Sequence, residues 1–147
     1  MLAVALTVVS CGGPRPPAPA DPEAAVRAFL GAVRANSLVA MGEIWGGSRG
    51  PASAYMDPAE LEQRLTVMRI YLEHEQYEIL PPGESGITGD RSRERIVRVQ
   101  LTRKGCTPVV PFTVVKWRDG WLVSNFDIAA AGNPARSCEP GETRRSS

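Results

Sequence analysis

Two side chains in this sequence have the chemistry of a general base. His74 is the only histidine, and the carboxylates of Glu73 and Glu75 beside it would raise its pKa. Asp127 ends the stretch Ser-Asn-Phe-Asp, with aromatic residues nearby in the sequence; enclosed in a pocket, this carboxylate would have a raised pKa that suits proton abstraction next to a carbonyl. The alternatives are an exposed polar corner for His74 and, for Asp127, a strand-end carboxylate bonded to backbone. Both residues are catalytic candidates, and the sequence alone assigns no catalytic residue.

Cys11 follows a short apolar run. Residues 2–9 are uncharged and too few to span a bilayer, which is typical of a signal-peptide core. Val-Val-Ser-Cys, which ends at Cys11, resembles the lipobox of bacterial lipoproteins, and a Gly-Gly pair follows it. We expect Cys11 to be the lipidated first residue, acylated with chains such as palmitate, and residues 1–10 to be a truncated signal peptide. No Lys or Arg precedes the apolar run, so we expect the true start codon upstream of Met1; the alternative is a buried strand with an incidental cysteine.

The lipid anchor sets the expected location. A lipidated Cys11 would hold the domain outside the cytoplasm, on the cell membrane or the outer membrane of a bacterial envelope. Gly12 is not an acidic retention residue, which is compatible with the outer membrane. Residues 11–20 are rich in Pro and Gly, and we expect an extended tether with no packing role.

Two further cysteines, Cys106 and Cys138, remain once Cys11 is assigned to lipid. An even pair in an exported domain suggests a disulfide, because thiols outside the cytoplasm oxidise. The alternative is a pair of free buried thiols. Two cysteines and one histidine at unrelated spacings do not form a zinc site, so no metal is expected.

The composition is that of one globular domain. The chain has 147 residues, of which 43% are hydrophobic and 22% are charged. Its 17 basic and 16 acidic side chains give a net charge of +1, without the basic excess of a nucleic-acid binder. The sequence also has no phosphate-cradling glycine loop and no nucleophile elbow. We therefore expect no nucleic-acid partner and no cofactor.

Helical spacing of apolar residues predicts three N-terminal helices. The first begins at the Asp-Pro pair at 21–22, the second follows Asn-Ser at 36–37 and stops at Gly-Gly at 46–47, and the third begins at Asp-Pro at 57–58. The loop from 46 to 56 carries Gly-Pro and is expected to be irregular.

Alternating patterns then predict four strands, at 75–80, 97–102, 112–117 and 121–128, with a polar loop at 83–92 and a hairpin turn at Asp119-Gly120. The predicted fold class is α+β, with three helices packed on a curved four-stranded antiparallel sheet. The domain would span residues 21–130. Residues 131–147 would form a disordered tail except where Cys138 is held.

Three features resemble the nuclear-transport-factor-like superfamily, which includes polyketide-cyclase-like and ketosteroid-isomerase-like proteins and small secreted lipoproteins. They are a first helix Glu-Ala-Ala-Val-Arg-Ala-Phe-Leu, a short second helix ending at Ile44-Trp45, and a hairpin Trp117-Arg-Asp-Gly-Trp121-Leu-Val. The resemblance spans residues 22–128. It implies a cystatin-like α+β cone with an internal pocket and, in the enzyme branches, a pocket carboxylate.

Five aromatic residues are pocket candidates on this resemblance, and ordinary core packing is the alternative for them. They are Trp45, Tyr55, Tyr71, Trp117 and Phe126. A basic cluster of Arg91, Arg93, Arg95 and Arg98 either meets anionic headgroups or forms a solvated strand face.

The expected function is that of an envelope lipoprotein that binds without catalysis. Its ligand would be a small hydrophobic molecule or a protein partner. The alternative is an isomerase- or dehydratase-like enzyme that uses Asp127, or His74. A third possibility is a homodimer formed through the open face of the sheet.

Overall fold

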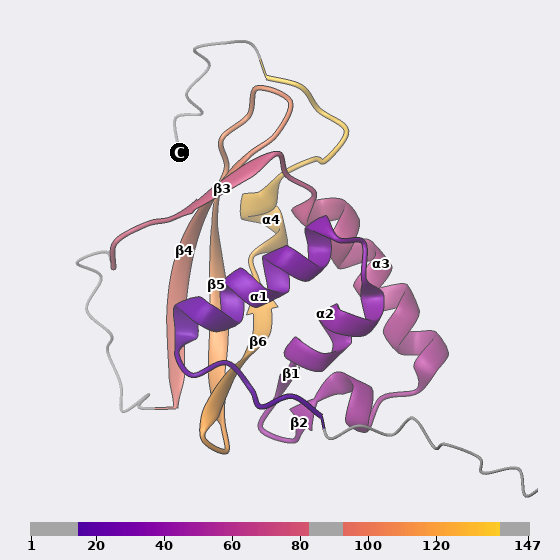
Figure 1. Ribbon diagram of the computed structural model, residues 1–147. Helices are drawn as coiled ribbons and strands as arrows, with labels where there is room; N and C mark the ends of the chain where they lie inside the picture. The colour runs from indigo at the N-terminus through magenta and orange to yellow at the C-terminus, as the bar shows by residue number, and fades with distance from the viewer. Residues whose placement is uncertain (1–14, 83–92, 139–147) are drawn as a thin grey trace, which may run out of the picture.

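The computed structural model describes residues 15–82 and 93–138, and its elements are arranged as an α+β domain (Figure 1). Cys11, the expected signal peptide at 1–10, the expected loop at 83–92 and the last nine residues of the expected tail lie outside the described residues.

The three longer helices begin at side-chain caps. They are α1 (Pro22–Arg34), α2 (Leu38–Ile44) and α3 (Pro58–Leu72). Asp21 accepts a hydrogen bond from the Ala24 amide at 2.8 Å, and Ser37 and Asp57 cap α2 and α3 in the same way. Each cap satisfies amide groups that have no partner inside the helix, and Pro at the first position costs nothing because it has no amide hydrogen to lose.

The segment between α2 and α3 is regular, so the expectation of an irregular loop was wrong. Strand β1 (Gly46–Gly47) pairs with β2 (Gly50–Pro51), and a 3₁₀ turn, η1 (Ala52–Ala54), follows. The two strands lie so close that a Cβ on Gly46 would fall 2.2 Å from the carbonyl oxygen of Gly50. Glycine permits this approach, and Gly50 itself has a φ of 103°.

The main sheet is an antiparallel meander. Its strands β3 (Gln76–Ile79), β4 (Glu94–Thr102), β5 (Val109–Trp117) and β6 (Gly120–Phe126) lie side by side in chain order. Strand β6 ends before the expected residue 128, because Asp127 caps a short helix, α4 (Ile128–Ala131). This helix was not expected from the sequence.

The core lies between α1 and one face of the sheet. Helix α1 crosses β4, β5 and β6 (Figure 1), and its Phe29 and Leu30 are fully buried. Phe112 of β5 and Phe126 of β6 pack against each other, with ring centres 5.8 Å apart. This layer is filled with apolar side chains, so burial there stabilises the fold.

Strand β6 contains an irregularity that changes which side chains face the core. Thr113 pairs with Asn125 and Val114 pairs with Val123, so Ser124 is an extra residue on β6. Strict alternation would place Val123 and Phe126 on opposite faces. The extra residue instead places both in the core.

The end of the expected tether packs on the domain, so the expectation of no packing role was wrong. The Trp121 amide donates a hydrogen bond to the Pro19 carbonyl at 2.9 Å, and Ala18 lies directly against Gly120. Arg15 forms an ion pair with Glu43 of α2 at 2.6 Å.

Candidate functional site

A groove of about 790 Å³ lies between α3 and the open end of the hairpin formed by β5 and β6, where β5 begins and β6 ends. Its volume falls within the range of small-molecule sites. Four elements contribute to it: α3, β5, β6 and α4. The lining residues are Gln63, Arg64, Val67, Met68, Pro111, Thr113, Asn125, Phe126, Asp127 and Ile128.

Helix α3 is apolar on more than the side that faces the core. Leu65 and Leu72 of α3 are buried, whereas Val67 and Ile70 are 48% and 41% exposed. A surface helix normally carries polar side chains at such positions. Val67 therefore offers the groove an apolar wall, opposite Phe126 and Ile128.

The charged residues of the groove interact with their own helices. Arg64 pairs with Glu60 one turn away at 2.7 Å, and Asp127 accepts a hydrogen bond from the Ala130 amide at 3.0 Å. Gln63, Thr113 and Asn125 add uncharged polar groups. The groove thus combines an apolar wall with hydrogen-bonding groups, which suits an amphipathic or hydrophobic ligand.

Asp127 lies at this groove but is exposed to solvent. It is the N-cap of α4, so it has the backbone-bonding role of a strand-end aspartate. Its side chain is open to solvent and engaged in this cap, whereas a base that abstracts a proton must be free to reach the substrate.

His74 follows the C-terminal end of α3 and does not line the groove. It is half-buried rather than an exposed corner, and its Nδ1 lies 2.8 Å from the Leu72 carbonyl oxygen. Nδ1 is therefore the donor, and the buried Nε2 has no hydrogen-bond partner among the described residues.

The expected rise in the pKa of His74 was wrong. Burial lowers the pKa below its ordinary value of 6.5, and the positive charges of Arg34 and Arg103 lower it further, although the hydrogen bond to Leu72 acts in the opposite direction. Desolvation is the largest of these effects, and the charges that act on the imidazole are those of the two arginines and not those of the flanking glutamates.

This lowered pKa predicts a pH-dependent stability. The unfolded chain binds the proton more tightly than the folded one, so the free energy of unfolding falls as the pH drops through 6.5. We expect urea unfolding to show a lower midpoint at about pH 5.5 than at about pH 7.5, and His74→Gln to reduce that difference. An equal difference in both proteins would contradict the assignment, because the chain has no other histidine.

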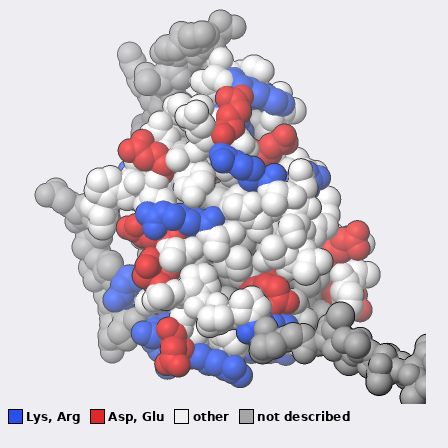
Figure 2. Space-filling model, viewed as in Figure 1, with Lys and Arg blue, Asp and Glu red and all other residues white. Residues whose placement is uncertain are grey.

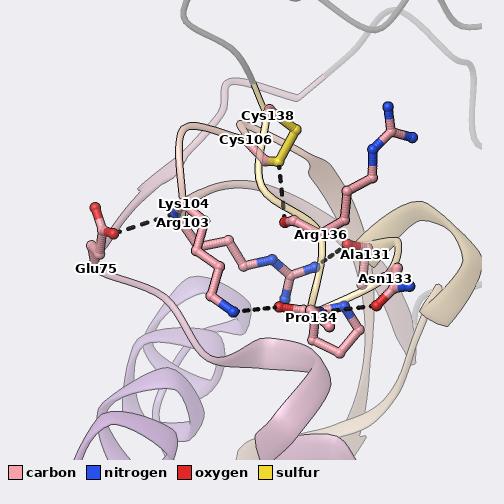
Figure 3. The surroundings of a disulfide bond; sticks show 10 residues. Glu75, Arg103, Lys104, Cys106, Ala131, Asn133, Pro134, Arg136 and Cys138 are labelled. Carbon is pink, nitrogen blue, oxygen red and sulfur yellow. Dashed lines mark hydrogen bonds between the residues drawn. A yellow bond between two sulfur atoms is a disulfide. The ribbon is translucent and has the colours of Figure 1, made fainter.

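Arg103 is a buried cation that was not among the predicted site residues. Only 6% of the residue is exposed, and its guanidinium donates hydrogen bonds to two carbonyl oxygens, that of Tyr71 and that of Ala131, the second of which Figure 3 shows. Burial lowers the pKa of the guanidinium below its ordinary range, and the charge of Glu73 opposes that shift. Arginine remains protonated in proteins, so this is a fixed positive charge.

A disulfide joins Cys106, in the turn after β4, to Cys138, with Cα atoms 4.9 Å apart (Figure 3). The Cys138 amide donates to the Lys104 carbonyl at 2.9 Å, and the Lys104 ammonium donates to the Pro134 carbonyl at 3.2 Å. The expected disorder was therefore wrong for residues 131–138, which are held against the domain.

Of the five aromatic pocket candidates, Phe126 lines the groove. Trp45 and Tyr71 pack against the core instead. Tyr55 lies beneath the Arg49 guanidinium at 4.3 Å, and Trp117 lies beneath that of Arg118 at 4.5 Å. These four residues belong to other parts of the domain.

Neither a membrane span nor a metal cluster occurs in the described part of the chain. No helix there is long and apolar enough to cross a bilayer, and no three His, Cys, Asp or Glu side chains converge to hold an ion. Comparisons with protein-family models, curated proteins and solved structures found no significant match to the chain.

Proposed function

We propose that this protein is a lipid-anchored binding module of the bacterial envelope. Cys11 carries the acyl anchor, and the groove beside α3 holds a small hydrophobic or amphipathic ligand without catalysis. The observation that carries the proposal is the groove itself, about 790 Å³ with an apolar wall formed by Val67, Phe126 and Ile128. The order of helices followed by an antiparallel meander supports the resemblance to the nuclear-transport-factor-like cone.

The exposure and position of the two candidate bases favour binding over catalysis. Asp127 is exposed and caps a helix, and His74 lies outside the groove. An isomerase- or dehydratase-like reaction needs a desolvated base within reach of the substrate. The described groove contains no such base, so the enzyme alternative has less support.

The ligand would place its apolar part against Val67, Met68 and Phe126. Its polar end would lie toward the side chains of Gln63 and Asn125, which can donate and accept hydrogen bonds. An uncharged polar head suits this arrangement, because Arg64 is already paired with Glu60.

A charge placed in the apolar wall of the groove should weaken binding. We expect Val67→Asp to weaken binding of the uncharged probe N-phenyl-1-naphthylamine at least tenfold, since burying a carboxylate against an apolar ligand carries a large desolvation cost. Fluorescence titration of the unacylated Cys11→Ser chain measures this affinity.

Val39→Asp is the matched control, because Val39 is a helix-surface valine, 80% exposed on α2, outside the groove. It should bind the probe as the parent does. Equal loss in both variants, or a parent that does not bind the probe, would reject the groove as the binding site.

A further inference from the structure

Basic side chains gather at one end of the domain, where β5 turns into β6 and where β1 turns into β2. Figure 2 shows several of them along the lower end of the molecule, with acidic side chains between them. We define the basic end by six residues: Arg15, Arg49, Arg93, Arg95, Lys116 and Arg118.

Contacts between these segments bring the cations together. The Lys116 amide donates to the Arg93 carbonyl at 2.8 Å, and Arg95 and Lys116 both lie over the ring of Trp121, at 5.9 and 5.6 Å. Arg118 lies over Trp117, whose ring touches Gly50, the neighbour of Arg49. The cluster therefore follows from the fold and not from proximity in the sequence.

Carboxylates near this end offset only part of the positive charge. Glu43 is paired with Arg15, and Glu23, at the start of α1, is paired with Arg27. Glu94 and Asp119 lie within the same strand and turn as the basic residues. Cations still outnumber carboxylates among these residues, so the end presents a net positive surface.

The chain leaves the described domain at this same end. Residues 15–20 run beneath α1 (Figure 1), and Pro19 is hydrogen-bonded to Trp121 within the basic end. Arg15 lies four positions after Cys11, so at most about 14 Å of extended chain separates them. The Debye length at physiological salt is about 8 Å, and a tether this short lets the cations come within that distance of a surface at the anchor.

We propose that the basic end rests on anionic lipid headgroups, so that the acyl anchor and the cations together fix the orientation of the domain. The proposal builds on the lipid anchor at Cys11 proposed above. Strand β6 runs from Gly120 at this end to Phe126 at the groove, about 20 Å at 3.3 Å per residue. The groove is then held clear of the membrane and open to its ligand.

Vesicle binding by the unacylated Cys11→Ser chain tests the basic end without the anchor. Co-sedimentation should show binding to vesicles of three parts phosphatidylcholine to one part phosphatidylglycerol, and little binding to phosphatidylcholine alone. The Lys116→Gln/Arg118→Gln double variant should bind the anionic vesicles roughly twentyfold more weakly, since each cation near an anionic surface contributes about fivefold. Salt at about 0.5 M should remove the binding of the parent.

The matched control is Lys104→Gln/Arg136→Gln, which removes the same charge at the opposite end, beside the disulfide (Figure 3). It should keep most of the parent's binding. Equal loss in both double variants, or no preference of the parent for anionic vesicles, would overturn the proposal. The intact mass of the membrane-bound wild type reports acylation separately, so a missing anchor and an inactive basic end give different results.

Discussion

We expect the free energy of unfolding of the Arg103→Met variant to be about 3 kcal/mol lower than that of the parent. The Arg103 guanidinium donates to Tyr71 in the last turn of α3 and to Ala131 at the end of α4. Carbonyl groups in the last turn of a helix have no partner within that helix, and a cation there also complements the helix dipole. One buried side chain therefore caps two helices, and methionine would leave both carbonyls unpaired in a dry environment.

Urea unfolding of three variants tests this role. Arg103→Lys should lose less stability than Arg103→Met, because the lysine ammonium keeps the positive charge. It should still lose some, because an ammonium lacks the planar guanidinium that donates to both carbonyls. Arg98→Met is the matched control, since Arg98 is an exposed arginine of β4, the strand that ends one residue before Arg103, and it should remain within about 0.5 kcal/mol of the parent. Equal unfolding midpoints for Arg103→Met and Arg98→Met would contradict the double-cap role.

Loss of the disulfide is the other large expected effect. Replacing Cys138 by serine should lower the free energy of unfolding by about 3–4 kcal/mol, because the bridge closes a loop of 32 residues that includes β5 and β6. The cross-link removes chain entropy mainly from the unfolded state. The variant should be made in the Cys11→Ser background, which leaves Cys106 as its single thiol.

Denaturant unfolding with and without reductant provides the comparison. Reduction of the parent should cause the same loss as Cys138→Ser, while the reduced and unreduced variant should unfold alike. A parent whose midpoint does not respond to reductant would show that the bridge does not stabilise the fold.

Local rules in the sequence accounted for much of the architecture. Asp-Pro pairs and Ser37 predicted the helix starts, since the cap depends on residues only a few positions apart. Alternation predicted the four strands in their order along the chain. It failed at the end of β6, because the extra residue Ser124 is defined by pairing with β5 and not by β6 itself.

The site was harder to predict because its parts come from distant segments. The groove depends on how α3 lies beside the hairpin, which no local pattern encodes. A signal was nonetheless present in α3, where Val67 and Ile70 add apolar residues outside the core stripe. Alternation also carried a signal for Arg103, which continues the inward-facing series Val97, Val99 and Leu101.

His74 shows how sequence neighbours can mislead. Glu73 and Glu75 flank it in the chain, but both are exposed, while the imidazole is half-buried near Arg34 and Arg103. Charge effects depend on distance and burial in the fold. The same reasoning applies to Asp127, whose closest hydrogen-bond partner is a backbone amide of the helix that follows it.

Native mass spectrometry of the unacylated, unreduced Cys11→Ser chain, exported from a bacterial host, tests the central claim most directly. We expect a discrete mass addition that remains bound under gentle ionisation, is absent from Val67→Asp and is retained by Val39→Asp. The same spectrum reports whether the chain is a monomer or a dimer. A parent with no bound mass, or the same mass on the parent and both variants, would contradict a ligand site in the groove.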